Sequence, residues 1–156
     1  MSAYNAIINA LELNPSIIAD MAQEFPVERR NVRPAPGKWS ALEHIAHLAR
    51  VGPFMNVRLT NMLENPGDPI VPYLPDNDSP SSLADADWDE ALRQYQWERA
   101  ALVGTLRDVS LLIWEREAKH PEYRTYSIRI MARHLALHDL LHGSRIEDLL
   151  LTTSRS

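Results

Sequence analysis

Apolar residues recur every three or four positions along most of this chain, which places them on one face of an α-helix. No stretch shows the sustained alternation of apolar and polar residues that is typical of a half-buried β-strand. The prolines fall almost entirely between the periodic segments, mainly at 34–36 and from 66 to 80. The pattern therefore predicts an all-α protein whose helices are separated by proline-containing connectors.

Capping residues indicate where the first helices begin and end. A helix is expected over about residues 3–13, and Asn14 followed by Pro15 is typical of the start of a second helix that reaches about Phe25.

Ser40 and Glu43 have the spacing of a capping box for a long helix over about 40–64. Within it, Gly52-Pro53 should kink or break the helix, because the proline ring opposes the carbonyl group one turn earlier.

The second half of the chain predicts three more helices. Asp87 and Glu90 have capping spacing for a helix to about Asp108, and further helices are expected over about 110–118 and 127–151. The predicted buried stripe of the first of these consists of Trp88, Leu92, Tyr95, Leu102 and Leu106. Residues 65–85 are predicted to be the least ordered part, covering one end of a helical bundle.

Composition limits the classes of protein to consider. The 156 residues suffice for one well-buried domain, 1–156, and an apolar fraction of 45% is ordinary for a soluble globular protein. A net charge of -5 without a basic block argues against nucleic-acid binding. No apolar stretch approaches the roughly 20 residues that span a bilayer, and no signal peptide is recognisable, so a cytoplasmic protein that does not bind membranes is expected.

Three histidines stand out as candidate metal ligands. His138 and His142 lie four residues apart on one predicted helix face, and His47 lies on the apolar side of another predicted helix. Buried imidazoles need polar partners, and one bound ion would satisfy all three while leaving positions open for water or substrate. The chain has no cysteine, so any metal site must use nitrogen and oxygen ligands.

Neighbouring polar residues leave alternatives open. His44 and His134 are within one turn of the chosen ligands and are either ligands themselves or supporting core histidines, which we favour; His120, beside a proline, is expected to be solvated. Glu43 or Asp139 could hold an imidazole in its ligating tautomer, or could be a solvated carboxylate. Arg99 either reaches the site and binds substrate, or pairs with a carboxylate.

The segment Pro36-Gly37-Lys38-Trp39-Ser40, followed by His47-Leu48, resembles the opening signature of the DinB/YfiT-like family of proposed metal-dependent enzymes. Tyr95 and Arg99, then Trp114-Glu115, then His138-x-x-x-His142-Gly follow in the same order, so the resemblance covers almost the whole chain. Trp39 itself is predicted to pack at the end of the bundle rather than to contact substrate.

The resemblance implies a four-helix bundle with up-down-down-up topology and short extra helices, often assembled as a homodimer. It also implies a divalent metal ion at His47, His138 and His142. Three imidazoles suit zinc, nickel, iron or copper, so the sequence does not identify the metal. Some members are transferases or isomerases that use low-molecular-weight thiols. Arg145 departs from the glutamine that many members carry at this position, and such a cation beside the metal would favour an anionic substrate group.

Three classes of function are compatible with these features. The first is a metal-dependent enzyme acting on a small molecule, either a hydrolase or a transferase that uses a thiol cofactor. The second is a non-catalytic bundle that binds a metal or ligand. In the third, the histidines have only a structural role. Because imidazoles must be neutral to ligate, metal binding is expected to fail as the pH falls through about 6.5.

Overall fold

The computed structural model describes residues 2–73 and 80–152, which form helices and connectors without a β-strand in the described part of the chain. The prediction of an all-α four-helix bundle is confirmed. None of the described helices combines the length and the apolar character needed to cross a membrane.

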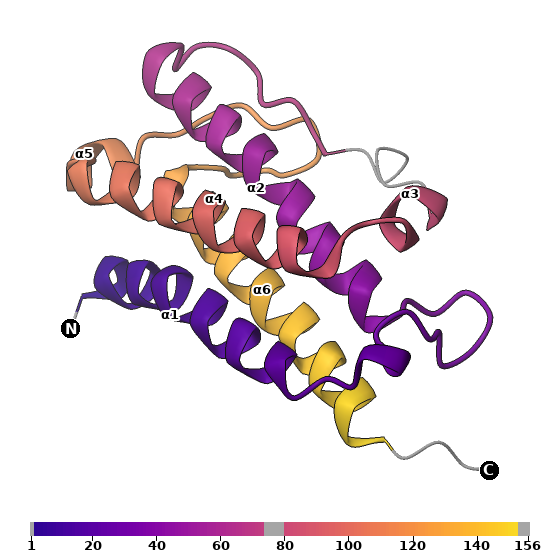
Figure 1. Cartoon of the computed structure of the whole chain (residues 1–156). Coiled ribbons are helices and arrows are strands. Elements are labelled where there is room, and N and C mark those ends of the chain that lie inside the picture. The colour runs from indigo at the N-terminus through magenta and orange to yellow at the C-terminus, as the bar shows by residue number, and fades with distance from the viewer. Residues whose placement is uncertain (1, 74–79, 153–156) are drawn as a thin grey trace.

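Four long helices make up the bundle: α1 (Ala3–Gln23), α2 (Ala41–Glu64), α4 (Trp88–Asp108) and α6 (Ile128–Leu151). Shorter elements occupy the connectors, namely η1 (Val27–Arg29), α3 (Pro80–Ala84) and α5 (Leu111–Trp114). In Figure 1, α1 and α6 run in one direction while α2 and α4 run in the other, which is the up-down-down-up order. Both α1 and α2 pack against α4 and α6.

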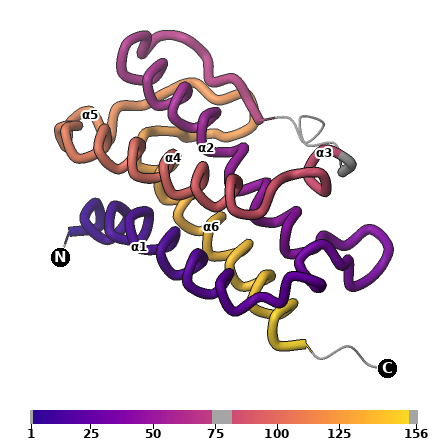
Figure 2. The backbone as a smooth tube through the Cα atoms, in the orientation of Figure 1, coloured from indigo at the N-terminus to yellow at the C-terminus, as the bar shows by residue number. Residues whose placement is uncertain are grey.

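This topology determines what the connectors do. Because α2 and α4 are parallel, the chain must return the full length of the bundle between them, which accounts for the long segment 65–87. Its first part returns along α2 instead of covering one end of the bundle: Ile70 is buried, and its backbone N–H donates to the carbonyl of Lys119 at 2.8 Å. Residues 74–79 of the predicted poorly ordered segment lie outside the described residues. Figure 2 shows the 24–40 connector at one end of the bundle and α5 at the other.

The capping predictions for two helices are confirmed. Ser40 and Glu43 form a reciprocal capping box at the start of α2, and the side chain of Asp87 accepts a hydrogen bond from the backbone N–H of Glu90 at the start of α4. Ser127 caps α6 in the same way. These caps satisfy backbone donors that have no partner within the helix, so local sequence alone determines where each helix begins.

The predicted break at Asn14 is wrong, because α1 is one helix with Pro15 inside it. Asn14 is buried mid-helix, and its side-chain amide donates to the carbonyl of Ala136 in α6 at 3.2 Å. A proline inside a helix costs about 3 kcal/mol, so packing of α1 against its neighbours outweighs the local signal.

Gly52-Pro53 does not break α2 either. At Gly52 the helix lies so close to α4 that an added Cβ would be 2.4 Å from the Cβ of Glu98. The adjacent Asn56 amide donates to both the backbone carbonyl and the carboxylate of Glu98, at 3.1 and 2.7 Å. The glycine therefore serves close helix packing and not a chain break.

Two smaller differences concern the second half of the chain. α5 ends at Trp114, four residues earlier than predicted, because the chain then extends and Ala118 donates its backbone N–H to the carbonyl of Tyr126 at 2.9 Å. Leu92 of the predicted α4 stripe is only partly buried, whereas the other four positions are buried.

Candidate metal centre

The three predicted ligands come together where the first half of α2 packs against α6. One nitrogen atom from each of His47, His138 and His142 lies within 4.8 Å of the other two. The Nε2 atoms of His47 and His138 are 3.0 Å apart. The capping box fixes the start of α2, and helical spacing fixes His138 and His142 on one face of α6, so both helices present their imidazoles to the same point.

A fourth imidazole belongs to this cluster. The Nδ1 atoms of His44 and His142 are 2.8 Å apart, which is hydrogen-bonding distance when one ring carries the proton and the other accepts it. A bond at Nδ1 leaves Nε2 of His142 for an ion, and fixing one ring nitrogen is the usual way in which a ligating histidine is oriented. His44 therefore lies in a supporting position, as favoured from the sequence.

Burial lowers the pKa of two rings of the cluster, His142 and His44. Burial is the main cause that lowers the pKa of His142 to about 2, and the neighbouring His138, His47, His44 and Arg145 act in the same direction. Burial also lowers the pKa of His44 to about 4, helped by Arg145 and His47. A neutral imidazole is the form that binds metal ions, so the environment of the cluster favours ligation near neutral pH.

Trp39, in the connector that precedes α2, covers the cluster. Its ring stacks on His142 with 5.9 Å between ring centroids and 19° between ring planes, and it contacts His47 at 5.1 Å. Tyr73, from the long connector, approaches His47 from another direction at 6.2 Å. The tryptophan is therefore part of the wall of the site.

Glu43 does not support His47 in this structure. Its carboxylate accepts hydrogen bonds from the backbone N–H of Ser40 at 2.8 Å and from Nε of Arg33 at 3.0 Å, and a second Arg33 nitrogen donates to its other oxygen. Burial opposes ionisation of this carboxyl, but the bonds from Arg33 and Ser40 outweigh it and hold its pKa below the ordinary value. Glu43 thus fixes the start of the helix that carries His44 and His47.

Asp139 and Arg99 bind each other in the centre of the bundle. Nε and one terminal nitrogen of Arg99 donate to the two carboxylate oxygens of Asp139 at 2.8 and 2.7 Å, and both residues are almost inaccessible to solvent. Arg99 also lies over the ring of Tyr95. Of the two alternatives for Arg99, the structure shows pairing with a carboxylate. Both carboxylate oxygens of Asp139 accept hydrogen bonds from Arg99.

Two cavities flank the cluster. The first, of about 230 Å³, is lined by His47, His138 and exposed His134, with Tyr73 and Tyr126 among the aromatic residues. The second, of about 500 Å³, is lined by Trp39, His44 and Arg145. The predicted residues His134 and Arg145 thus lie beside the cluster but on different sides of it.

His120 is not simply solvated as predicted. It lines the 230 Å³ cavity, packs against Tyr123 and Tyr126 with ring centroids 4.5 and 4.6 Å away, and accepts the backbone N–H of Glu122 at Nδ1. Neither it nor Tyr73 could be assigned to the site from sequence, because both come from connectors without periodicity. The sequence did indicate His44, because it lies one turn before His47 on the same helix face.

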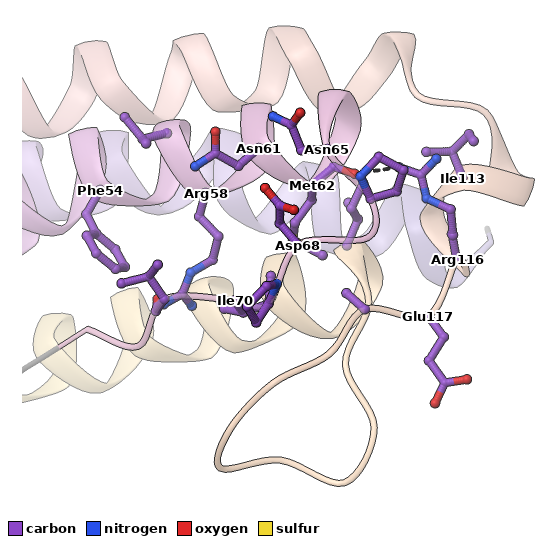
Figure 3. Close-up of a pocket in the computed structure, with 16 residues that line it drawn as sticks. Phe54, Arg58, Asn61, Met62, Asn65, Asp68, Ile70, Ile113, Arg116 and Glu117 are labelled. Atoms are coloured by element: carbon purple, nitrogen blue, oxygen red, sulfur yellow. Dashed lines mark hydrogen bonds between the residues drawn. The ribbon is translucent and has the colours of Figure 1, made fainter.

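A third cavity, of about 330 Å³, is remote from the histidines. Figure 3 shows it between the end of α2, the segment around Ile70 and the chain after α5, with Asp68 and Arg116 among its walls. Arg58 lines both this cavity and the 230 Å³ cavity, but none of the clustered histidines reaches this one. Its location gives it no part in metal chemistry.

Comparisons with known proteins agree with the architecture. A model of the DinB superfamily matches residues 10–146. Among solved structures, YfiT from Bacillus subtilis superposes with a TM-score of 0.83 at 19% sequence identity, over 94% of this chain and 85% of YfiT; it is described as a probable metal-dependent hydrolase with an unusual four-helix bundle topology. A search of curated proteins gives no match. Because the family model spans most of its length, the chain belongs to the DinB superfamily.

Proposed function

We propose that this protein is a divalent-metal-dependent enzyme that holds its ion with His47, His138 and His142. The observation that carries the proposal is the convergence of three imidazoles, with one nitrogen atom of each within 4.8 Å of the others, on facing helices. The facing helices hold these nitrogen atoms close enough together for one ion to contact all three.

The donor set fits the ion. Three imidazole nitrogens without thiolate suit zinc, nickel or iron, and leave at least one coordination position open. Such an ion lowers the pKa of a bound water or thiol toward neutrality, which supplies a nucleophile near pH 7. His44 would orient the ring of His142, and Trp39 would exclude bulk water from that side of the centre.

The reaction that we propose is hydrolysis, or transfer of a group to a small thiol cofactor. The description of YfiT as a probable metal-dependent hydrolase supports the first, although the likeness to YfiT is one of fold. The 230 Å³ cavity beside His47 and His138 is smaller than the roughly 300–1,000 Å³ of typical ligand pockets, which supports a small-molecule substrate over a large one.

Metal content is the first test. Protein purified without a nickel column should contain about one equivalent of a divalent metal per chain by inductively coupled plasma mass spectrometry. Turnover of ester substrates, or of an electrophile with a thiol donor, should be abolished by a chelator and restored by the metal. Stoichiometric metal without turnover of any substrate would support a non-catalytic binding protein instead, and absence of metal would leave the histidines a structural role.

A further inference from the structure

The 500 Å³ cavity on the Trp39 side of the histidine cluster has the features of an anion site. It lies between the connector that precedes α2 and the last turns of α6. Lys38 and Arg145 are on its walls, and His44 and Trp39 separate it from the three candidate ligands.

The side chains of Lys38 and Arg145 have no polar partner in the described part of the chain. Among the described residues, neither the side chain of Lys38 nor that of Arg145 makes a hydrogen bond or an ion pair. By contrast, Arg29 donates hydrogen bonds to backbone carbonyls at the end of α6. Arg33 donates to the carboxylate of Glu43. Asp148 is the one carboxylate on the same walls, and it too has no ion pair, so the described lining carries more positive than negative charge.

Arg145 lies close to the histidine cluster, because it lines the same cavity as His44 and Trp39. Trp39 stacks on the ring of His142, and Nδ1 of His44 is 2.8 Å from Nδ1 of that ring. A ligand held by Arg145 would therefore lie at the edge of the candidate metal centre. The planar guanidinium can bind a carboxylate or phosphate through two parallel hydrogen bonds, and an ammonium group nearby adds attraction without geometric demand.

We propose that this cavity binds the acidic group of a small substrate, with Arg145 and Lys38 as its ligands and Trp39 as the wall against which the rest of the substrate lies. The position of the substrate's reacting group at the metal rests on the proposed function. Binding of the acidic group depends only on the cavity. A carboxylate and a phosphate have the chemistry required, and separate probes distinguish them.

The experiment measures binding of malonate, inorganic phosphate and neutral malonamide by titration calorimetry, with the indole N–H signal of Trp39 in NMR as a local reporter. Metal-free and zinc-loaded wild-type protein are compared with Arg145→Gln, Lys38→Gln and Asp148→Asn. The matched control is Arg133→Gln, which removes an exposed α6 arginine outside the cavity, roughly 18 Å along the helix.

We expect malonate or phosphate to bind metal-free wild-type protein and shift the Trp39 signal. Arg145→Gln should weaken this binding about ten-fold, since one charge-assisted pair is lost, and Lys38→Gln should weaken it less. Asp148→Asn should strengthen it, and Arg133→Gln should leave it unchanged. The probe that binds more tightly identifies the acidic group.

Other results would overturn the proposal. If malonamide binds as well as malonate, if Arg145→Gln behaves like Arg133→Gln, or if neither anion binds wild-type protein, the cavity is not an anion site. If anions bind only zinc-loaded protein and Arg145→Gln has no effect, the ion alone holds them. If zinc does not bind but Arg145-dependent anion binding persists, the metal proposal fails while the anion site stands.

Discussion

At the scale of single residues, the roles that we propose for the clustered histidines predict different effects of substitution. His47→Ala and His142→Ala should each abolish stoichiometric metal, because each removes one of three proposed ligands. His44→Ala should weaken binding by about 10 to 100-fold, as expected for a residue that orients a ligand. Zinc titration with a competing chromophoric chelator measures each affinity.

The controls are His134→Ala and His120→Ala, which should bind metal like wild type because neither ring belongs to the cluster. Loss of metal in His134→Ala with retention in His47→Ala would show that the ligand set is displaced by one helical turn. If every variant binds as wild type does, no three-histidine centre exists.

The buried pair of Arg99 and Asp139 makes a second prediction at this scale. Asp139→Asn leaves the guanidinium of Arg99 buried without its counter-ion and should lower the free energy of unfolding by about 3–5 kcal/mol. Replacing both residues with apolar ones, Arg99→Met with Asp139→Leu, should recover most of this loss, as judged by urea denaturation. A double variant less stable than Asp139→Asn would show that the pair itself contributes net stability.

At the scale of elements, the close approach of α2 and α4 depends on Gly52. Gly52→Ala should destabilise the fold by about 1–3 kcal/mol, because the new methyl group would overlap the Cβ of Glu98. Gly104→Ala in α4 is the matched control: its Cβ meets nothing within 4 Å, so the higher helix propensity of alanine should raise stability by about 0.5–1 kcal/mol. Equal effects on the melting temperature would contradict this account.

The helices also show which parts of the fold the sequence can predict. The predicted caps at Ser40 and Asp87 were correct because each depends on bonds within three or four residues. The break at Asn14-Pro15 was wrong because the cost of an internal proline is opposed by packing and by a bond to Ala136, which lies 122 residues away. Local signals are reliable only where no distant partner competes with them.

At the scale of the whole molecule, the neutral histidines link stability to pH. The folded-state pKa of His44 is about 4 and that of His142 about 2, below the ordinary 6.5. Between these values the unfolded chain binds protons that the folded protein does not, so the metal-free protein should lose stability as the pH falls below about 6.5. The slope is at most about 1.4 kcal/mol per pH unit for each histidine.

Urea denaturation of metal-free protein at pH values from about 7 to about 5 measures this slope, and His142→Asn should make it shallower. Stability that stays constant or rises over this range would refute the linkage. The same low pKa values reduce proton competition at these rings, so loss of metal should occur at a lower pH than the 6.5 expected from an ordinary imidazole.

Assembly is a further prediction for the whole molecule. The outer faces of α1 and α6, which pack against each other, expose Ile17, Leu140 and Leu141 at 62%, 51% and 52%. An apolar surface of this kind is typical of an interface, so we expect a homodimer of the 17.8 kDa chain. Light scattering should give twice the chain mass, and Ile17→Glu with Leu140→Glu should give the monomer; a monomeric wild type would refute the prediction.

The sequence by itself determined the helical class, most helix ends and the three histidines that meet, because periodicity and i,i+4 spacing act within one helix. Only the tertiary structure decided which partner each polar group takes: His44 binds His142, Asp139 binds Arg99, and Glu43 binds Arg33. It also decided which side of the cluster Arg145 faces. A buried carboxylate or imidazole is stabilised by whatever lies within about 3 Å of it, and residues far apart in the chain fix those distances only when the helices pack.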